Sequence, residues 1–235
     1  MNIQLKITLS NIEPPIWRRV LVSDKSTLLD LHDLIQYCFN WKDYHLHMFE
    51  VSGMKFVSVE DWDEDSGRYQ DDSMTRLGDL IPRFIGEGKV FKYYYDFGDG
   101  WVISIIVEKI IHDKPEQKTP RIVEGERAAP PEDVGGVWGY NDFLEALQDS
   151  SHPEHYSYLE WIGGSFNPEY FDVDEVNHTL TQTLQRRKLI RESTWPVGPI
   201  YVNFLNITQN EWTESLSAEL KAETAALPLR RDMLT

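Results

Sequence analysis

The chain has 235 residues, of which 39 are acidic and 23 are basic, and its formal net charge is −16. Because affinity for nucleic acid comes largely from clustered cations that displace counterions, this balance argues against a general DNA- or RNA-coating protein. With 41% hydrophobic residues, one cysteine and no apolar run near the roughly 18 residues of a membrane span, we expect an ordered cytoplasmic domain with no internal disulfide and no membrane partner.

The first forty residues predict a β-hairpin covered by one helix. Apolar and polar residues alternate over 3–9, the period of a strand with one buried face, and 16–22 is a second strand after a proline-containing turn. Thr27 and Asp30 have the spacing of a capping box. The apolar positions behind them predict a helix over 28–39 that packs on the hairpin.

The middle of the chain predicts two more hairpins. Strands are expected over 47–51 and 54–59, and again over 91–97 and 102–111. The strand over 102–111 is apolar on both faces, so we expect it to be central and covered on each side. The acidic run 60–65 between the hairpins lacks the ligand pattern of an EF-hand, which favours a solvated loop over a calcium or basic-partner site.

The second half of the chain predicts helices. A proline-rich loop is expected over 112–139, followed by helices over 141–149, 153–162 and 172–188, then a strand over 200–207 and a helix over 210–226. Strands first and helices later indicate an α+β fold: an N-terminal mixed sheet with one packed helix, with a β-grasp-like arrangement as one version, and helices toward the C-terminal side.

Charge divides the chain into a domain and an extension. Residues 1–185 carry a net charge of −17 and residues 186–235 a net charge of +1. The change begins at a basic cluster, Arg186, Arg187, Lys188 and Arg191. This cluster either contacts phosphate or complements the dipole of a helix C-terminus, and the second interpretation is favoured.

An ordered series of motifs carries a family resemblance. The motifs are Trp17-Arg18-Arg19-Val20, Leu31-His32, Trp41-x-x-Tyr44-His45-Leu46-His47-x-Phe49, Tyr95-Asp96-Phe97-Gly98-Asp99-Gly100-Trp101, Gly125-Glu126-Arg127-Ala128, Pro130-Pro131-Glu132-Asp133-Val134-Gly135-Gly136 and Gly139-Tyr140. In this order they resemble the plasmid pRiA-type ORF-3-like family over residues 2–185. The resemblance implies the domain and no established biochemical activity, although some relatives carry resolvase or repressor labels.

Two departures from the family pattern argue against an enzyme. Many relatives continue Glu-His after the tryptophan of the DFGD-x-W motif, where this chain has Val102 and Ile103. Relatives also often have cysteines in the long loop, where this chain has Val123, Ala129 and Val134. A family chemistry that uses that histidine or those thiols would be missing here.

Aromatic residues beside glycines are candidates for a ligand-binding surface. Aromatic rings with a few polar groups commonly line a groove, although most such rings belong to the core. The candidate ligand-binding residues are Trp41, Trp101, Glu132, Asp133, Trp138 and Tyr140. Glu132 and Asp133 belong to the PPEDVGG loop (residues 130–136), an exposed rigid segment that contributes little to a core.

Histidines and aspartates supply a candidate metal site. Asp96 and Asp99 lie in the DFGDGW turn (residues 96–101), and His45 and His47 are two residues apart. A divalent cation takes such ligands, and Glu132 and Asp133 join the set if the PPEDVGG loop closes onto the DFGDGW turn. The alternative is that the aspartates cap their own turn and the histidines are hydrogen-bonded on one strand face. The sequence requires no cofactor.

These observations favour a non-catalytic binding or adaptor module. Its surface is the DFGDGW turn with the PPEDVGG loop, and its partner is a protein or a small polar ligand. Two alternatives stay open: a metal-dependent enzyme at the histidine and carboxylate set, and association with DNA through the basic residues after 185. The binding surface and the metal site both depend on the loop and the turn lying together in space.

Overall fold

The computed structural model describes residues 1–58, 68–81 and 83–193, with side chains described as far as 183. Residues Met1–Arg191 form one compact unit. The acidic run 60–65, the predicted strand 200–207 and helix 210–226, and the side chains of the basic cluster lie outside the described residues. None of the described helices is both long and apolar enough to cross a membrane.

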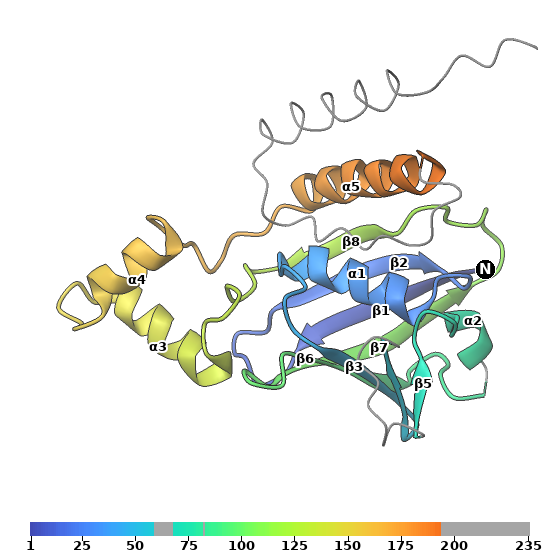
Figure 1. The fold of residues 1–235 in the computed structure, drawn as a ribbon, viewed down its shortest axis with the longest axis horizontal. Coiled ribbons are helices and arrows are strands. Elements are labelled where there is room, and N and C mark those ends of the chain that lie inside the picture. Colours follow the sequence, from blue (N-terminus) through green and yellow to red (C-terminus); the bar gives the residue numbers. More distant parts are fainter. Residues whose placement is uncertain (59–67, 82, 194–235) are drawn as a thin grey trace, which may run out of the picture. The chain divides into compact units, whose positions relative to one another are not determined.

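Eight strands form one sheet in the order β5-β4-β3-β6-β7-β1-β2-β8, antiparallel except for the pair β4 and β5 (Figure 1). The strands are β1 (Asn2–Leu9), β2 (Trp17–Ser23), β3 (His47–Val51), β4 (Met54–Val57), β5 (Tyr69–Asp71), β6 (Val90–Tyr95), β7 (Trp101–Ile111) and β8 (Arg121–Glu126). The helices are α1 (Leu28–Phe39), α2 (Leu77–Leu80), α3 (Gly136–Gln148), α4 (His155–Ile162) and α5 (Val173–Ser193).

The α+β class and the hairpins predicted from the sequence are confirmed. A β-grasp sheet has a parallel pair of central strands, whereas β1 is antiparallel to both β2 and β7, so that version of the prediction is wrong. The predicted loop over 112–139 is also wrong in part, because it contains β8 and the first turn of α3. The boundary at residue 185 stays a prediction, and α5 continues past it.

The core lies on one face of the sheet, where period-2 alternation places the apolar side chains. Ile3, Leu5 and Ile7 are fully buried, as their spacing predicts. Strand β7 is central, between β6 and β1. Its residues nevertheless alternate between buried and half-buried positions along Trp101–Val107, so only one face is fully covered, and the prediction of cover on both faces is wrong.

Helix α1 lies across this face (Figure 1). Its N-terminus carries the predicted capping box: Thr27 Oγ1 accepts from the Asp30 amide at 3.0 Å, and Asp30 accepts from the Thr27 amide at 2.9 Å. Asn40 ends the helix in the left-handed conformation. The chain then passes through residues 41–46 to β3, and this connection carries part of the candidate site.

A buried arginine fixes the two segments that carry the site. Arg18 is 1% exposed, and its guanidinium donates to the carbonyl oxygens of Cys38, Trp17, Glu126 and Arg127 at 2.8–2.9 Å. Burial lowers its pKa to about 10, which leaves it charged at neutral pH. Cys38 is in the last turn of α1, and Arg127 directly follows β8 on the way to the PPEDVGG loop. One cation therefore holds the two segments at the points where they lead into the site.

Helix α5 covers the edge strand β8. The side-chain amide of Asn177 donates to the Ile122 carbonyl at 2.8 Å, and its oxygen accepts from the Ile122 amide at 2.9 Å. This pair imitates the hydrogen bonds of a neighbouring strand and satisfies the backbone of one buried residue at the sheet edge.

Candidate functional site

The DFGDGW turn is built around Asp96. Asp96 has φ 51°, a left-handed conformation that aspartate tolerates, and its Oδ1 accepts from the amides of Gly98 at 2.9 Å and Asp99 at 3.3 Å. Capping therefore occupies one carboxylate oxygen, as the turn chemistry predicts. The other oxygen, Oδ2, faces the connection that carries His45.

The PPEDVGG loop closes onto this turn, as predicted. The Gly135 amide donates to Asp99 Oδ2 at 3.0 Å. Gly136 has φ +67° and lies against the Asp99 backbone so closely that a Cβ atom there would overlap the Asp99 carbonyl oxygen. Gly139, in the first turn of α3, lies equally close to the Val134 carbonyl. The glycines are therefore required by close backbone approach.

Two further anchors join the loop to the connection after α1. Trp41 donates from Nε1 to the Pro130 carbonyl at 3.0 Å. Glu132 accepts from the Lys42 amide at 2.6 Å and from the Tyr95 hydroxyl at 2.9 Å. The loop is thus tied to the turn at one end and to residues 41–42 and β6 at the other.

These anchors place three carboxylates around one imidazole. His45 Nε2 lies 2.8 Å from Asp133 Oδ1, 3.6 Å from Asp96 Oδ2 and 3.9 Å from Glu132 Oε1. The ligand atoms of His45, Asp96 and Asp133 all lie within 4.8 Å of one another. The side chain of Asp133 is 59% exposed and that of His45 is 30% exposed, so this cluster, the His45 cluster, is open to solvent on one side.

The electrostatics of the His45 cluster favour positive charge. Partial burial acts to lower the pKa of His45, but the hydrogen bond to Asp133 and the charges of Asp96, Asp133 and Glu132 outweigh it, so this pKa lies above its ordinary value. Burial raises the pKa of Glu132, against the opposing effect of the Lys42 and Tyr95 hydrogen bonds. The cluster therefore holds a proton more readily than its members would alone.

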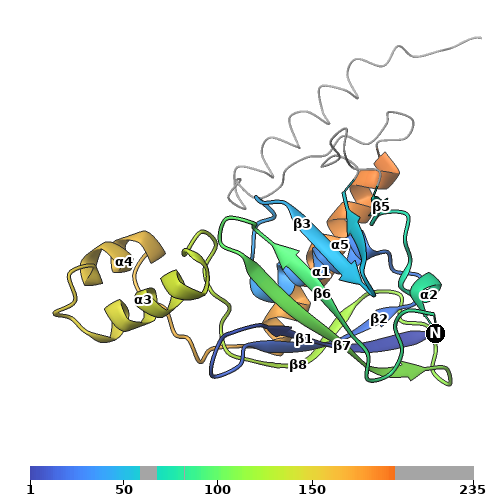
Figure 2. The ribbon, with the colours of Figure 1, turned by 90° about the horizontal axis from the view of Figure 1, so that it is seen from below.

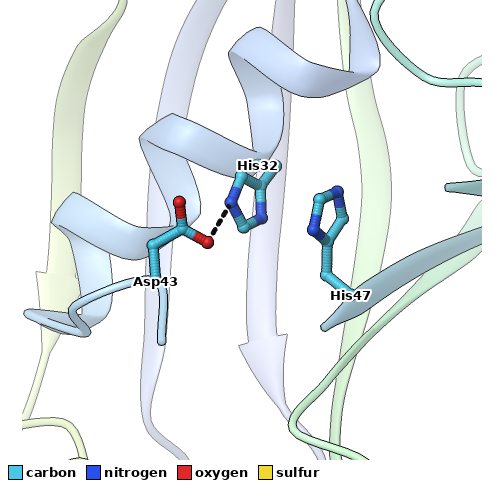
Figure 3. Close-up of side chains that lie close together, drawn as sticks. All are labelled: His32, Asp43 and His47. Atoms are coloured by element: carbon cyan, nitrogen blue, oxygen red, sulfur yellow. Dashed lines mark hydrogen bonds and ion pairs between the residues drawn. The ribbon is translucent and has the colours of Figure 1, made fainter. Parts of the chain in front are cut away.

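The other predicted histidine, His47, belongs to a different cluster. Figure 3 shows its ring beside that of His32 on α1, with Asp43 on the far side of His32. The two rings stack with centroids 3.7 Å apart and planes 15° apart. His47 Nε2 pairs with Asp72 at 2.7 Å, and His32 pairs with Asp43 at 2.9 Å and with the Tyr93 hydroxyl at 2.8 Å.

This second cluster, in which the two histidines are buried and Asp43 is exposed, also has three potential ligand atoms within 4.8 Å. The lone pair of an imidazole nitrogen lies in the plane of its ring. Because the two rings are nearly parallel with centroids 3.7 Å apart, their lone pairs do not converge on one ion. Both nitrogens of His32 are already hydrogen-bonded. Burial and the neighbouring His32 lower the pKa of His47. The arrangement is that of a buried hydrogen-bonded network, which separates His47 from the predicted metal set.

Comparison with known proteins identifies the family. The family model of the plasmid pRiA4b ORF-3-like protein matches residues 1–175. The chain belongs to this family. It is 40% identical over 167 residues to the uncharacterized protein y4hQ of Sinorhizobium fredii. The alignment covers 69% of this chain and 81% of that protein. It resembles the crystal structure of MM3350, a protein of unknown function from Methanosarcina mazei, with 39% identity and a TM-score of 0.65, covering 74% of this chain and 96% of that one.

The aromatic candidates of this family member have different environments. Trp41 and Trp101 are 4% and 2% exposed, so both are core residues. The ring of Trp41 stacks on that of Tyr95, with centroids 4.9 Å apart, and so packs against a residue that anchors Glu132. Tyr140 is fully buried, and its hydroxyl has no hydrogen-bond partner among the described residues. Trp138 is 86% exposed on the first turn of α3. Of the four, only Trp138 offers its ring to solvent.

Sequence reasoning missed the partners of the buried network. His32 belongs to the Leu31-His32 motif and is a polar position on the apolar face of α1, but neither observation reveals its partners, and Asp72 lies outside the described strands. A polar residue on the apolar face of a helix does indicate that a hydrogen-bond partner lies nearby, because a buried polar group requires one. Asp99, predicted as a metal ligand, instead anchors the PPEDVGG loop through its Oδ2.

Proposed function

We propose that the domain binds a divalent cation where the PPEDVGG loop meets the DFGDGW turn, with His45, Asp96 and Asp133 as its protein ligands. The observation that carries the proposal is the convergence of one imidazole nitrogen and two carboxylate oxygens within 4.8 Å. Glu132 contributes a further carboxylate 3.9 Å from His45. A mixed nitrogen and oxygen set suits Zn²⁺, Mn²⁺ or Fe²⁺.

The electrostatic field supports the same proposal. The carboxylates that raise the pKa of His45 would stabilise a metal ion at the same place, because both are positive charges among three acidic groups. The ion would displace the proton shared between His45 and Asp133. Hydrogen bonds from the Tyr95 hydroxyl and the Lys42 amide hold the Glu132 carboxylate in position beside the proposed ion.

The exposure of the cluster defines how a bound ion would act. Asp133 and His45 are partly exposed, so coordination positions remain open toward solvent. A polar ligand or a carboxylate of a partner protein would complete the sphere there, which is the role of a binding module. Catalytic metal sites keep an open position of the same kind, and this favours metal-assisted hydrolysis as the second candidate.

Calorimetric titration of the full chain with Mn²⁺ and Zn²⁺, after chelator treatment, tests the proposal. One ion per chain is expected, and His45→Gln or Asp96→Asn should weaken binding at least tenfold. Asp96→Asn keeps the oxygen that caps the turn, so it removes charge without removing the turn. His112→Gln and Asp113→Asn, an exposed matched pair outside the cluster, should leave affinity unchanged.

Three results would overturn the proposal. They are the absence of stoichiometric binding, an equal loss in the His112 and Asp113 variants, and binding that survives the His45 change but is lost in His47→Gln. The last result would move the ion to the buried network. Urea denaturation of each variant shows that it is folded before its affinity is compared.

A further inference from the structure

The segment that contains α3 and α4 is negative throughout. Residues 128–185 include eleven Asp and Glu and no Lys or Arg. The two helices lie side by side in both ribbon views (Figures 1 and 2), and the Tyr158 hydroxyl of α4 donates to Asp142 of α3 at 2.8 Å. A surface with this charge attracts cations and repels phosphate.

A hollow of about 340 Å³ lies between α4 and the PPEDVGG loop. It is lined by Asp133, Val134, Glu154, Ser157, Tyr158 and Trp161. Trp161 is 47% exposed although its ring is held edge-on to Phe143 at 5.8 Å and to Tyr158 at 6.3 Å. The Glu154 carboxylate accepts no hydrogen bond from the described residues. The hollow therefore presents a fixed indole beside two carboxylates.

We propose that this hollow docks an arginine side chain of a basic segment in a partner protein. A guanidinium stacks on an aromatic face while its planar N–H groups donate to carboxylates, so Trp161 and Glu154 supply the two halves of its recognition. Charge complementarity selects this occupant, because every charged residue of the lining is acidic. The proposal is independent of the metal ion, although Asp133 borders both sites.

A short synthetic peptide with three arginines separated by glycines tests the proposal. Titration is performed on the full chain in the presence of EDTA, so that loss of the metal site and failure of docking are distinguishable. The same peptide with citrulline, a neutral isostere of arginine, should bind at least tenfold more weakly. Trp161→Ala and Glu154→Gln should each reduce affinity for the arginine peptide about fivefold to tenfold.

Matched controls come from the same helix. Glu160→Gln removes an equal charge, and Tyr156→Ala removes an aromatic ring that is 75% exposed, against 47% for Trp161. Neither residue lines the hollow. Both should bind the peptide as the unmodified chain does. The proposal is overturned by absent binding, by equal losses in these controls, which would indicate diffuse attraction, or by free arginine amide binding as tightly as the peptide. Glu154→Gln keeps the Trp161 packing, so its result stands even if Trp161→Ala is unstable.

Discussion

Replacing Gly136 with alanine tests the closure of the PPEDVGG loop on the DFGDGW turn. The added Cβ would meet the carbonyl oxygen, carbonyl carbon and Cα of Asp99, all backbone atoms that no side-chain rotation can move away. Gly100 supplies a matched control in the same turn. Its φ of +68° equals the +67° of Gly136 within a degree, and a Cβ at Gly100 would have no atom within 4 Å.

The structure gives the expected magnitudes. Alanine in the left-handed region costs about 1–2 kcal/mol at either position. At Gly136 the loop must also withdraw, which breaks the hydrogen bond from the Gly135 amide to the Asp99 carboxylate, a charged bond that contributes about 1.5–3 kcal/mol. Gly136→Ala should therefore lower the free energy of unfolding by about 2 kcal/mol more than Gly100→Ala does.

Urea denaturation followed by tryptophan fluorescence measures both values. The Gly136 variant should also lose Mn²⁺ affinity, because Asp133 moves with the loop, while the Gly100 variant keeps it. If the two variants are destabilised equally, within about 0.5 kcal/mol, the loop is not held on the turn by this contact and the reasoning is refuted.

Three other perturbations follow from the same contacts. Arg18→Met should destabilise the domain by at least about 3 kcal/mol, because it leaves buried carbonyls without donors. Arg19→Met, which removes partly exposed ion pairs with Glu108 and Glu124, should cost less than about 1 kcal/mol, and similar losses for the two variants would contradict the anchoring role of Arg18. In an NMR titration, the pKa of His45 should lie above the ordinary histidine value of about 6.5 and that of His47 below it. The stability that protonated His45 contributes is therefore lost as the pH rises through its raised pKa, whereas the buried neutral His47 destabilises the fold as the pH falls below about 6.5. The reverse order of the two pKa values would refute both environments. Asp96→Ala should unfold at lower urea than Asp96→Asn, since only asparagine keeps the turn cap, and equal midpoints would show that the cap contributes nothing.

The sequence predicted the parts of the fold that follow from local rules. The alternation over 3–9 and the Thr27 capping box are local signals, and both elements form where predicted. Strand β8 was missed because it is an edge strand with only Ile122 fully buried, so its residues show no alternation. The start of α3 was missed because Gly135 and Gly136 indicate a loop, although here they serve close backbone approach.

The candidate site was predicted in part for the same reasons. The proline-glycine loop and the aspartate turn carry local signatures, and their meeting was a hypothesis that the Gly135–Asp99 contact bears out. The pairing of His45 with His47 failed because two-residue spacing places side chains on one face only within a regular strand, and His45 lies on a bend before β3. The partners of His47 are distant in sequence, and no local pattern reveals them.

The central claim is that His45, Asp96 and Asp133 together hold a divalent cation. Anomalous diffraction from crystals of the full chain soaked in Mn²⁺ tests it most directly. The account predicts one strong peak within bonding distance of His45 Nε2, Asp96 Oδ2 and Asp133 Oδ1. A map with no peak there, or with its strongest peak between His32 and His47, would contradict it.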